Sequence, residues 1–286
     1  MLFDTYRDFI FYDGAMGTML QKSGLKPGDR PDIMNMTAPG AVEDIHRMYV
    51  NAGSDIICTN TFGANAVALR GTGYSPEDII TAAVSLAKKA CGGKAKVALD
   101  IGPTGLLLEP LGDVKLTEAY ELFKEQAAAG EKAGADYAAI ETMSDLAELS
   151  AAISAVKENT GLPVLATMTF DKTGRTFMGC TPELFAETAE KLGADAAGLN
   201  CSVEPAGMYS TAQRIAKATS LPLIVKPNAG LPHGVTGLYS IGPEEFARQM
   251  VPFIKIGAKI IGGCCGTTPE YIAGLRRAFL APGEES

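Results

Sequence analysis

Histidine is scarce in this sequence, because the 286 residues contain only His46 and His233. Zinc hydrolases more often combine nitrogen and oxygen ligands with a bound water, so two histidines give little support to that chemistry. His46 falls in an expected helix and His233 in an expected loop. We expect both to be structural or exposed rather than metal ligands.

Basic surfaces and long apolar segments are also missing. The net charge of −8 leaves no excess of basic residues for a nucleic-acid groove. No uninterrupted apolar run approaches the roughly 18 residues expected of a membrane span. The start, "MLFDTYRDFIFYDG", carries acids and lacks the apolar core of a secretory signal. We therefore expect a cytoplasmic protein with neither a nucleic-acid nor a membrane partner.

Cysteine is the chemically informative residue that is present. In a chain without a secretory signal, clustered cysteines more often bind metal or act in catalysis than form disulfides. Cys264 and Cys265 are adjacent in "GGCCGTT", and neighbouring cysteines make poor disulfide partners. Glycines on both sides permit a sharp turn that could present two thiolates to one metal ion. A redox pair and plain buried thiols are the alternatives.

Short apolar runs recur along the chain and predict its fold class. They are continuous rather than alternating, as expected of parallel strands buried on both faces. Segments with helical spacing separate them, including helices that we expect to open at Thr117, Ser144 and Thr181. Residues 14–40 read as a long loop. The eight runs span residues 9–14, 55–60, 96–102, 137–142, 163–170, 196–201, 222–228 and 259–265.

Eight alternating units predict an α/β protein with a single (β/α)8 TIM barrel over residues 1–286. A doubly wound open sheet is the structural alternative. That fold normally carries G-x-G-x-x-G after its first strand, and "DGAMGT" does not match this pattern. In a barrel, we expect the active site at the C-terminal ends of the strands.

Three cysteines reach this predicted rim. Cys201 closes the sixth run, and Cys264 with Cys265 closes the eighth. A zinc site with three thiolate ligands and an open fourth position follows, with three buried thiols as the simpler alternative. Cys58 could supply a fourth thiolate or point into the core, because strand alternation decides its side. Cys91 and Cys180 fall at a helix end and in a loop, where we expect no metal.

Carboxylates also end the predicted strands. Asp13 and Glu141 each follow an apolar run, where a carboxylate is partly desolvated unless a cation or a hydrogen-bond donor meets it. A substrate ammonium is one such partner, and a loop cap or salt bridge is the other. Asp100 is similarly ambiguous, and Lys226 could simply neutralise this acidic rim. A zinc ion with three thiolates suits alkyl transfer to a thiol, because the metal lowers the pKa of an incoming thiol.

At these residues the sequence resembles the homocysteine S-methyltransferase family, and within it the N-terminal homocysteine-binding barrel of cobalamin-dependent methionine synthases. The matching segments run in one register from Asp13 to Leu280: "DGAMGTMLQ", "TNTFGAN", "IETMSDLAE", "GLNC", "KPNAGLP" and "GGCCGTTPEYI". The resemblance implies that homocysteine sulfur becomes the fourth ligand of zinc. It also implies the metal ligands Cys201, Cys264 and Cys265.

The resemblance extends to the substrate residues. It implies that Asp13 and Glu141 hold the amino group of homocysteine and that Phe62 helps to wall the pocket. Asn228, in "PNAG", matches a position that can hold the fourth site of the zinc before substrate enters. Glu204, in "NCSVEPAGM", stands where the family pattern has glycine.

The methyl donor follows from the same likeness. Enzymes that use S-methylmethionine typically show "PNSGE" and an arginine after the cysteine pair, whereas "PNAGLP" and "CCGTT" side with the corrinoid-dependent branch. The cobalamin-binding pattern D-x-H-x-x-G is broken, because "DIHRMY" has Tyr49 in place of glycine. We expect methylcobalamin on a separate methyl-corrinoid protein or on a missing domain. The alternatives are S-methylmethionine, S-adenosylmethionine or betaine as donor, or a non-catalytic thiol- or zinc-binding module.

Overall fold

Eight parallel strands form the centre of the described part of the chain. The computed structural model describes residues 8–232 and 239–280, so the expected loop position of His233 lies outside the described residues. The strands are hydrogen-bonded in the order β1-β8-β7-β6-β5-β4-β3-β2, and a parallel bridge between Tyr12 and Ile56 joins the two ends of the sheet. They are β1 Ile10–Phe11, β2 Ile56–Cys58, β3 Lys96–Ile101, β4 Tyr137–Met143, β5 Val164–Met168, β6 Ala196–Asn200, β7 Leu223–Lys226 and β8 Ala258–Ile261.

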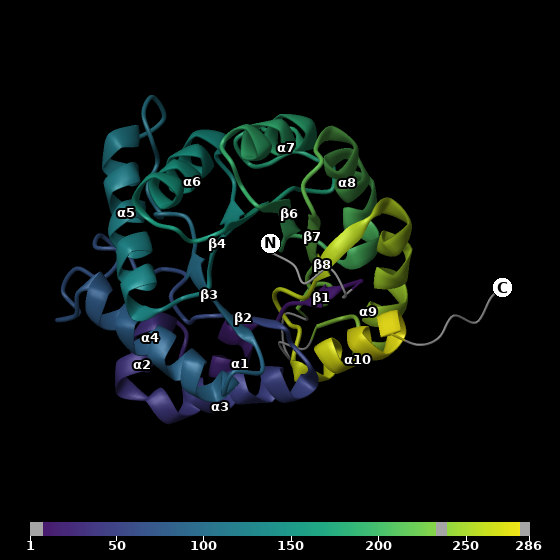
Figure 1. Cartoon of the computed structure of the whole chain (residues 1–286), viewed down its shortest axis with the longest axis horizontal. Helices are drawn as coiled ribbons and strands as arrows, with labels where there is room; N and C mark the ends of the chain where they lie inside the picture. Colours follow the sequence, from purple (N-terminus) through teal and green to yellow (C-terminus); the bar gives the residue numbers. More distant parts are fainter. Residues whose placement is uncertain (1–7, 233–238, 281–286) are drawn as a thin grey trace.

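Helices surround the strands in a ring, and the expected (β/α)8 barrel is confirmed (Figure 1). None of the described helices has an apolar stretch long enough to cross a membrane. The α-helices are α1 Met16–Lys22, α2 Met34–Thr37, α3 Pro39–Ala52, α4 Pro76–Cys91, α5 Leu116–Ala133, α6 Leu146–Asn159, α7 Pro182–Lys191, α8 Pro205–Ala218, α9 Pro243–Met250 and α10 Pro269–Leu280. The described residues also form the 3-10 helices η1 Pro31–Ile33 and η2 Val251–Ile256.

Side-chain alternation along the strands separates two apolar layers. Residues such as Val97, Leu99 and Ile101 of β3 pack against the surrounding helices. The intervening residues form a smaller cluster inside the barrel, with members from all eight strand positions. This cluster contains Tyr12, Ile56, Cys58, Ala98, Ala139, Leu165, Ala196, Ile224 and Ile260.

The inward-facing register turns polar toward the C-terminal ends of the strands. Because side chains repeat their direction every two residues, Asp100, Glu141 and Lys226 face the same interior as Ala98, Ala139 and Ile224. Thr167 and Asn200 continue this layer on β5 and β6. The barrel therefore has an apolar lower layer and a polar upper layer at the rim where barrel chemistry occurs.

The prediction of a long loop over residues 14–40 is wrong. The segment contains α1, η1 and α2, and α3 begins at Pro39. Leu20 is fully buried, and Met16 and Met19 pack against the core. A helix of seven residues that includes Gly17 has little intrinsic stability, so this packing accounts for its formation.

Helix starts agree with the sequence to within two residues. Thr181 caps α7 as expected, and its side chain accepts a hydrogen bond from the Leu184 N–H. The N-cap of α6 is Asp145 rather than Ser144, and α5 begins at Leu116 instead of Thr117. Left-handed glycines end several helices before the next strand, such as Gly134 at φ 92°.

Candidate metal and substrate site

Three thiols meet at the C-terminal rim. Cys201 directly follows β6, while Cys264 and Cys265 lie in the turn after β8. Their sulfur atoms all lie within 4.8 Å of one another, and the sulfurs of Cys201 and Cys265 are 3.8 Å apart. All three residues are partly buried. The structure thus brings together the cysteines that the strand ends predicted.

The chain bends sharply at the first of these cysteines. Cys201 and Ser202 adopt φ values of 64° and 61°, a left-handed conformation that is uncommon outside glycine. The Cys201 N–H donates to the Lys226 carbonyl at 3.0 Å. Thr169 Oγ1 donates to the Asn200 carbonyl at 2.8 Å and lies 2.9 Å from Ser202 Oγ. Neighbouring strands therefore hold a strained bend, a feature that clusters at functional sites.

Glycines shape the turn that carries the cysteine pair. Gly266 has φ 82°, and a Cβ atom at Gly263 would lie 2.3 Å from Thr267 Oγ1. Larger residues would thus disturb the backbone on both sides of the pair. The Cys264 N–H donates to the Pro227 carbonyl at 2.8 Å, and the Ala229 N–H donates to the Cys265 carbonyl at 2.9 Å. The turn is thereby joined to the segment that follows β7.

The three sulfurs influence one another's protonation. Hydrogen bonds with Cys264 and Cys265 lower the pKa of Cys201 to about 3, which makes it the first thiolate of the group. Hydrogen bonds with Cys201 and Cys265, reinforced by burial, raise the pKa of Cys264 well above its usual range. The hydrogen bond with Cys201 and burial raise the pKa of Cys265 to about 11, against the lowering effect of its hydrogen bond with Cys264. A metal cation would relieve this competition, because it stabilises all three thiolates together.

Asn228 lies beside the thiols. Its backbone N–H donates to the Val203 carbonyl at 3.0 Å, and its side chain forms a hydrogen bond with Cys201 that also lowers the pKa of that thiol. The Asn228 Oδ1 atom is buried and has no hydrogen-bond partner among the described residues. A buried acceptor of this kind is costly unless a ligand or an ion meets it.

The donor set fits zinc. In a tetrahedral site with Zn–S bonds of about 2.3 Å, two thiolates lie about 3.8 Å apart, which matches the separation of Cys201 and Cys265. Three thiolates form a soft ligand set that favours zinc over magnesium or calcium. The unpartnered Oδ1 of Asn228 adds an oxygen donor beside them. Cys201, Cys264 and Cys265, with Asn228 as an accessory donor, could therefore hold this ion.

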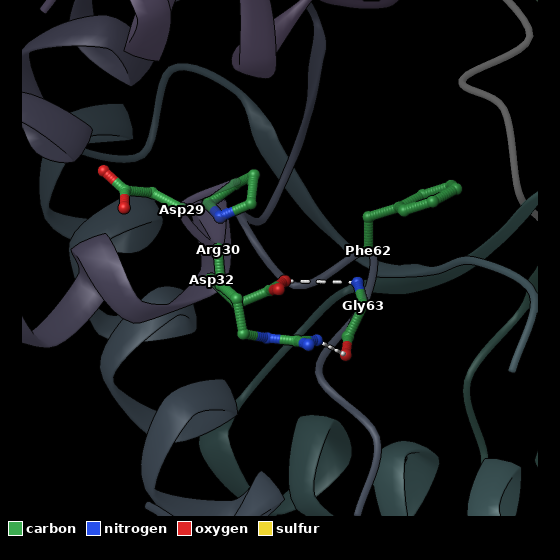
Figure 2. Close-up of a pocket in the computed structure, with 6 residues that line it drawn as sticks. Asp29, Arg30, Asp32, Phe62 and Gly63 are labelled. Atoms are coloured by element: carbon green, nitrogen blue, oxygen red, sulfur yellow. Dashed lines mark hydrogen bonds between the residues drawn. The ribbon is translucent and has the colours of Figure 1, made fainter. Parts of the chain in front are cut away.

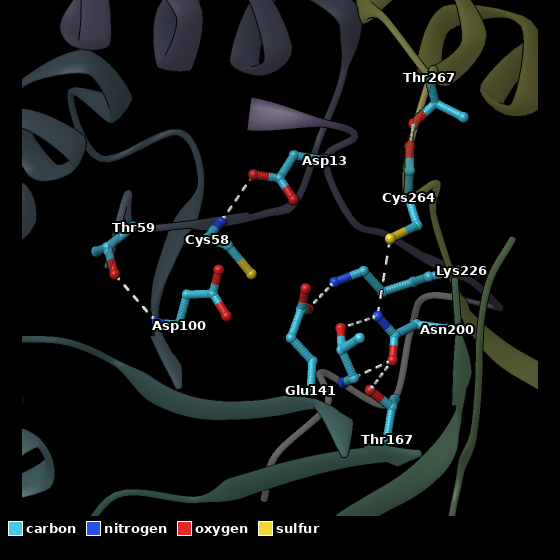
Figure 3. A network of polar contacts seen from close by, with 11 residues as sticks. Asp13, Cys58, Thr59, Asp100, Glu141, Thr167, Asn200, Lys226, Cys264 and Thr267 are labelled. Carbon is cyan, nitrogen blue, oxygen red and sulfur yellow. Dashed lines mark hydrogen bonds and ion pairs between the residues drawn. The ribbon is translucent and has the colours of Figure 1, made fainter. Parts of the chain in front are cut away.

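A buried acidic layer lies in the same barrel interior (Figure 3). Asp13 accepts a hydrogen bond from the Cys58 N–H at 2.8 Å. Burial raises the pKa of the Asp13 carboxyl to about 7, against the opposing effects of Lys226 and the Cys58 N–H. Asp13 is 2% exposed, so its carboxyl is shielded from solvent.

Glu141 forms an ion pair with Lys226. The two side chains are 13% and 5% exposed, and Lys226 Nζ lies 4.3 Å from the centre of the Tyr12 ring. Burial alone would lower the pKa of Lys226, but Glu141 and the other nearby acids outweigh it and raise this pKa well above the usual range. Lys226 therefore neutralises part of the acidic rim, as the sequence suggested.

Phe62 lies on the loop after β2, next to a pocket of about 280 Å³ (Figure 2). Its ring packs over Gly102, where a Cβ atom would come within 2.6 Å of ring carbons. The Gly102 N–H donates to the Phe62 carbonyl at 3.0 Å. Because Gly102 lies directly after β3 and two residues beyond Asp100, Phe62 lies near the mouth of the acidic layer. The pocket is lined by Asp29, Arg30, Pro31, Asp32, Phe62 and Gly63.

Asn200 has a connecting role that the sequence did not reveal. Its Oδ1 accepts hydrogen bonds from the Thr142 N–H at 2.9 Å and from Thr167 Oγ1 at 2.8 Å. Its Nδ2 donates to Thr142 Oγ1 at 2.8 Å and lies 3.8 Å from the sulfur of Cys264. This amide links β4 and β5 to the thiol cluster. The sequence held one sign of this role: Asn200 directly precedes Cys201, and strand alternation turns its side chain into the barrel.

The remaining candidates lie elsewhere. Cys58 joins the interior layer near Asp100 and Glu141 rather than the thiol cluster. Cys91 ends α4 and Cys180 precedes the N-cap of α7; both are buried, and neither belongs to the thiol cluster. His46 is buried in α3, and neither ring nitrogen has a partner in the described part of the chain.

Glu204, which stands where the family pattern has glycine, adopts a backbone conformation that is common for any residue. Glu204 precedes α8 with φ −70° and ψ 166°, an extended conformation that does not require glycine. The bend before it is carried instead by Cys201 and Ser202.

Comparisons with known proteins agree with this architecture. A family model for homocysteine S-methyltransferase matches residues 10–279. Methionine synthases of Mycobacterium leprae (strain TN) and Mycobacterium tuberculosis (strain ATCC 25618 / H37Rv) are each 34% identical over 282 and 286 residues. These matches cover 91% of this chain but 23% and 24% of the relatives, so the chain spans about a quarter of their length.

Solved structures show the same fold. The homocysteine methyltransferase MmuM from Escherichia coli has a TM-score of 0.83 in its oxidized form and 0.81 in its metallated form. Each comparison covers 95% of this chain and 96% of the other at 23% identity. Because the homocysteine S-methyltransferase family model matches nearly the whole sequence, this chain belongs to that family.

Proposed function

We propose that residues 1–286 form one homocysteine-binding barrel domain that acts as a zinc-dependent methyltransferase and converts homocysteine to methionine. The observation that carries the proposal is the convergence of Cys201, Cys264 and Cys265, with a sulfur separation of 3.8 Å that suits tetrahedral zinc. Membership of the family and the 34% identity to methionine synthases support homocysteine as the acceptor.

The metal would be held by the three thiolates, with Asn228 beside them. When bound, zinc would lower the pKa of the acceptor thiol, so that a nucleophilic thiolate forms near neutral pH. Zinc sites that act on substrates keep a position open for them. The left-handed bend at Cys201 and the glycine-flanked turn at Cys264 hold the ligands around such a position.

The chain's own side chains would orient the acceptor. In this proposal Asp13 and Glu141 face the substrate ammonium, and Phe62 helps to wall the substrate pocket at the mouth of the acidic layer. Asn200 fixes Thr142 next to Glu141 and lies 3.8 Å from the sulfur of Cys264. A single amide thus couples the position of the acidic layer to that of the thiols.

The proposed methyl donor is a methyl-corrinoid carried by a separate protein or by another domain. The sequences "PNAGLP" and "CCGTT" favour this branch of the family. The curated relatives are about four times as long as the matched region, so they contain segments beyond a barrel of this kind. Tyr49 is helical and fully buried, so the broken D-x-H-x-x-G segment offers no corrinoid loop.

A donor-exchange assay tests the proposal. Zinc-loaded protein is incubated with homocysteine and one donor at a time: methylcobalamin, S-methylmethionine, S-adenosylmethionine or betaine. We expect methionine, measured by mass spectrometry, to form with methylcobalamin and with none of the other three donors. Methionine formed from another donor would overturn the donor assignment, and homocysteine binding without transfer from any donor would indicate a binding module.

A further inference from the structure

Among the described residues, the acidic layer holds more carboxylates than cations. Asp13, Asp100 and Glu141 are all buried or nearly so, and Lys226 supplies one positive charge to the three. Buried carboxylates are unfavourable unless cations or hydrogen-bond donors meet them. Burial and the neighbouring Glu141 raise the pKa of Asp100 well above its usual range, with Lys226 acting in the opposite direction. A cation beside Asp100 would oppose this rise and favour the charged carboxylate, so the layer can accept a further cation.

The three carboxylates differ in the cations and hydrogen-bond donors that they already contact. Glu141 has the Lys226 ammonium, and Asp13 has the Cys58 N–H. Asp100 is 9% exposed, and its Oδ1 has no hydrogen-bond partner within the described ranges. The Thr59 hydroxyl accepts a hydrogen bond from the Asp100 N–H, and the Thr61 hydroxyl donates one to the Asp100 carbonyl, so both bonds involve the Asp100 backbone rather than its carboxyl. The unsatisfied acceptor of the layer is thus Asp100.

The unpaired oxygen lies where a single ammonium could bridge two acids. One ligand atom each from Cys58, Asp100 and Glu141 lies within 4.8 Å of the others. Charge-assisted N–H···O bonds of about 2.8 Å allow one nitrogen to reach two oxygens up to about 5.6 Å apart. Figure 3 shows the Asp100 carboxylate directed toward Cys58 and Glu141. Burial also keeps the Cys58 thiol protonated by raising its pKa, so it adds no charge.

We propose that Asp100 binds the α-ammonium group of the acceptor thiol, together with Glu141, and that Lys226 holds Glu141 in position for this contact. The inference rests on the proposed function, because it assumes an amino-acid thiol as acceptor. It adds an ammonium-binding residue and gives Lys226 a positioning role. A thiol that lacks the ammonium group would leave the Asp100 carboxyl without a partner.

Two matched thiols test the assignment on the zinc-loaded full chain. Homocysteine and 4-mercaptobutyrate share the thiol and the carboxylate and differ in the ammonium group, and calorimetry measures the affinity of each. We expect the wild type to prefer homocysteine by about 10-fold or more, the value of a charged hydrogen bond. Asp100→Asn should remove most of this preference while its zinc content and its affinity for 4-mercaptobutyrate stay unchanged.

Glu148→Gln is the matched control. Glu148 is another buried carboxyl with a raised pKa, but its oxygen accepts hydrogen bonds from the Thr104 N–H at 2.8 Å and from Thr104 Oγ1 at 2.6 Å. It lies on α6, outside the proposed site, so its substitution should leave the preference intact. Lys226→Met should reduce the preference through Glu141.

The outcomes separate the two proposals. If the wild type binds no homocysteine, the proposed function fails and this inference fails with it. If the wild type binds homocysteine but Asp100→Asn keeps the full preference, only the Asp100 assignment is overturned. Equal weakening of both thiols in Asp100→Asn would also overturn it. The wild-type preference needs no variant, so its absence contradicts an ammonium site even if Asp100→Asn fails to fold.

Discussion

The hydroxyl of Tyr49 donates a hydrogen bond of 2.8 Å to the carbonyl of Thr267, which joins α3 to the turn that carries the cysteine pair. Tyr49 is fully buried. Thr267 in turn donates to the Cys264 carbonyl through its N–H at 3.1 Å and through Oγ1 at 2.7 Å. A helix from the N-terminal part of the chain thus supports a proposed metal ligand.

Tyr49→Phe removes this hydroxyl and little else. We expect the free energy of unfolding to fall by about 1 kcal/mol, since one buried hydrogen bond is lost. We also expect weaker zinc binding, because the turn that presents Cys264 becomes less constrained. Urea unfolding and competition with a chelator measure the two effects. Tyr120→Phe is the matched control, because the Tyr120 hydroxyl bonds the exposed Glu158 at 2.7 Å far from the turn; equal effects of both variants would contradict the role of Tyr49.

Each proposed thiolate ligand should be necessary for zinc. We expect the purified wild type to carry close to one zinc per chain, and Cys201→Ala, Cys264→Ala or Cys265→Ala to lose most of it, because two thiolates leave an incomplete shell. Elemental analysis of the purified proteins measures the content. Cys91→Ala and Cys180→Ala are controls that change buried thiols outside the cluster and should keep the metal. Full zinc retention in all three ligand variants would place the metal elsewhere.

Strand positions and their rim residues could be predicted from the sequence because parallel strands leave a simple signal. Continuous apolar runs marked all eight strands, and the rule that parallel strands end at one rim brought Cys201 near Cys264 and Cys265. Helix α1 was missed because a short helix with weak propensity depends on packing. Packing partners lie far away in the sequence and leave no local periodicity.

Contacts across the barrel could not be predicted in the same way. Alternation shows that Glu141 and Lys226 face inward, but it does not show that they meet, since they lie on β4 and β7. The amide of Asn200 likewise connects Thr142 and Thr167 through side-chain conformations that no spacing rule specifies. Strand alternation therefore predicts which residues face the site, whereas the structure is needed to show which of their side chains contact one another.

His46 should make stability depend on pH. Burial without hydrogen-bond partners among the described residues lowers its pKa from 6.5 to about 4. The unfolded chain binds the proton first on acidification, so the stability contribution is fully present above pH 6.5 and is lost as the pH falls toward 4. The shift corresponds to about 3 kcal/mol. Urea unfolding at several pH values measures it.

The variant His46→Leu isolates this contribution from the other titrating groups. It should be at least as stable as the wild type at pH 7, because it removes a buried polar ring without partners. The difference in unfolding free energy between variant and wild type should then widen between pH 6.5 and 4. A constant difference over this range would show that His46 does not titrate as its burial requires.

Proton release should accompany binding of the acceptor. Homocysteine, the proposed acceptor, is mainly a thiol near neutral pH, but its thiolate is the form that would ligate zinc and attack a methyl group. Near neutral pH we expect the thiol to release close to one proton per site, measured by calorimetry in buffers with different ionisation enthalpies. Homoserine, which has a hydroxyl in place of the thiol, should bind weakly and release far less, because a hydroxyl is less acidic and a poorer ligand for a soft site.

Cobalt substitution tests the same step at the metal. Cobalt in place of zinc should give a thiolate charge-transfer band from Cys201, Cys264 and Cys265, and homocysteine should change this band when its sulfur becomes the fourth ligand. Homoserine should leave the band close to its starting form, since it brings no additional sulfur. If homocysteine binds with no proton release and an unchanged cobalt spectrum, the metal is structural. The acidic layer would then hold a substrate whose thiol does not reach the metal, and activation of the sulfur would have to come from elsewhere.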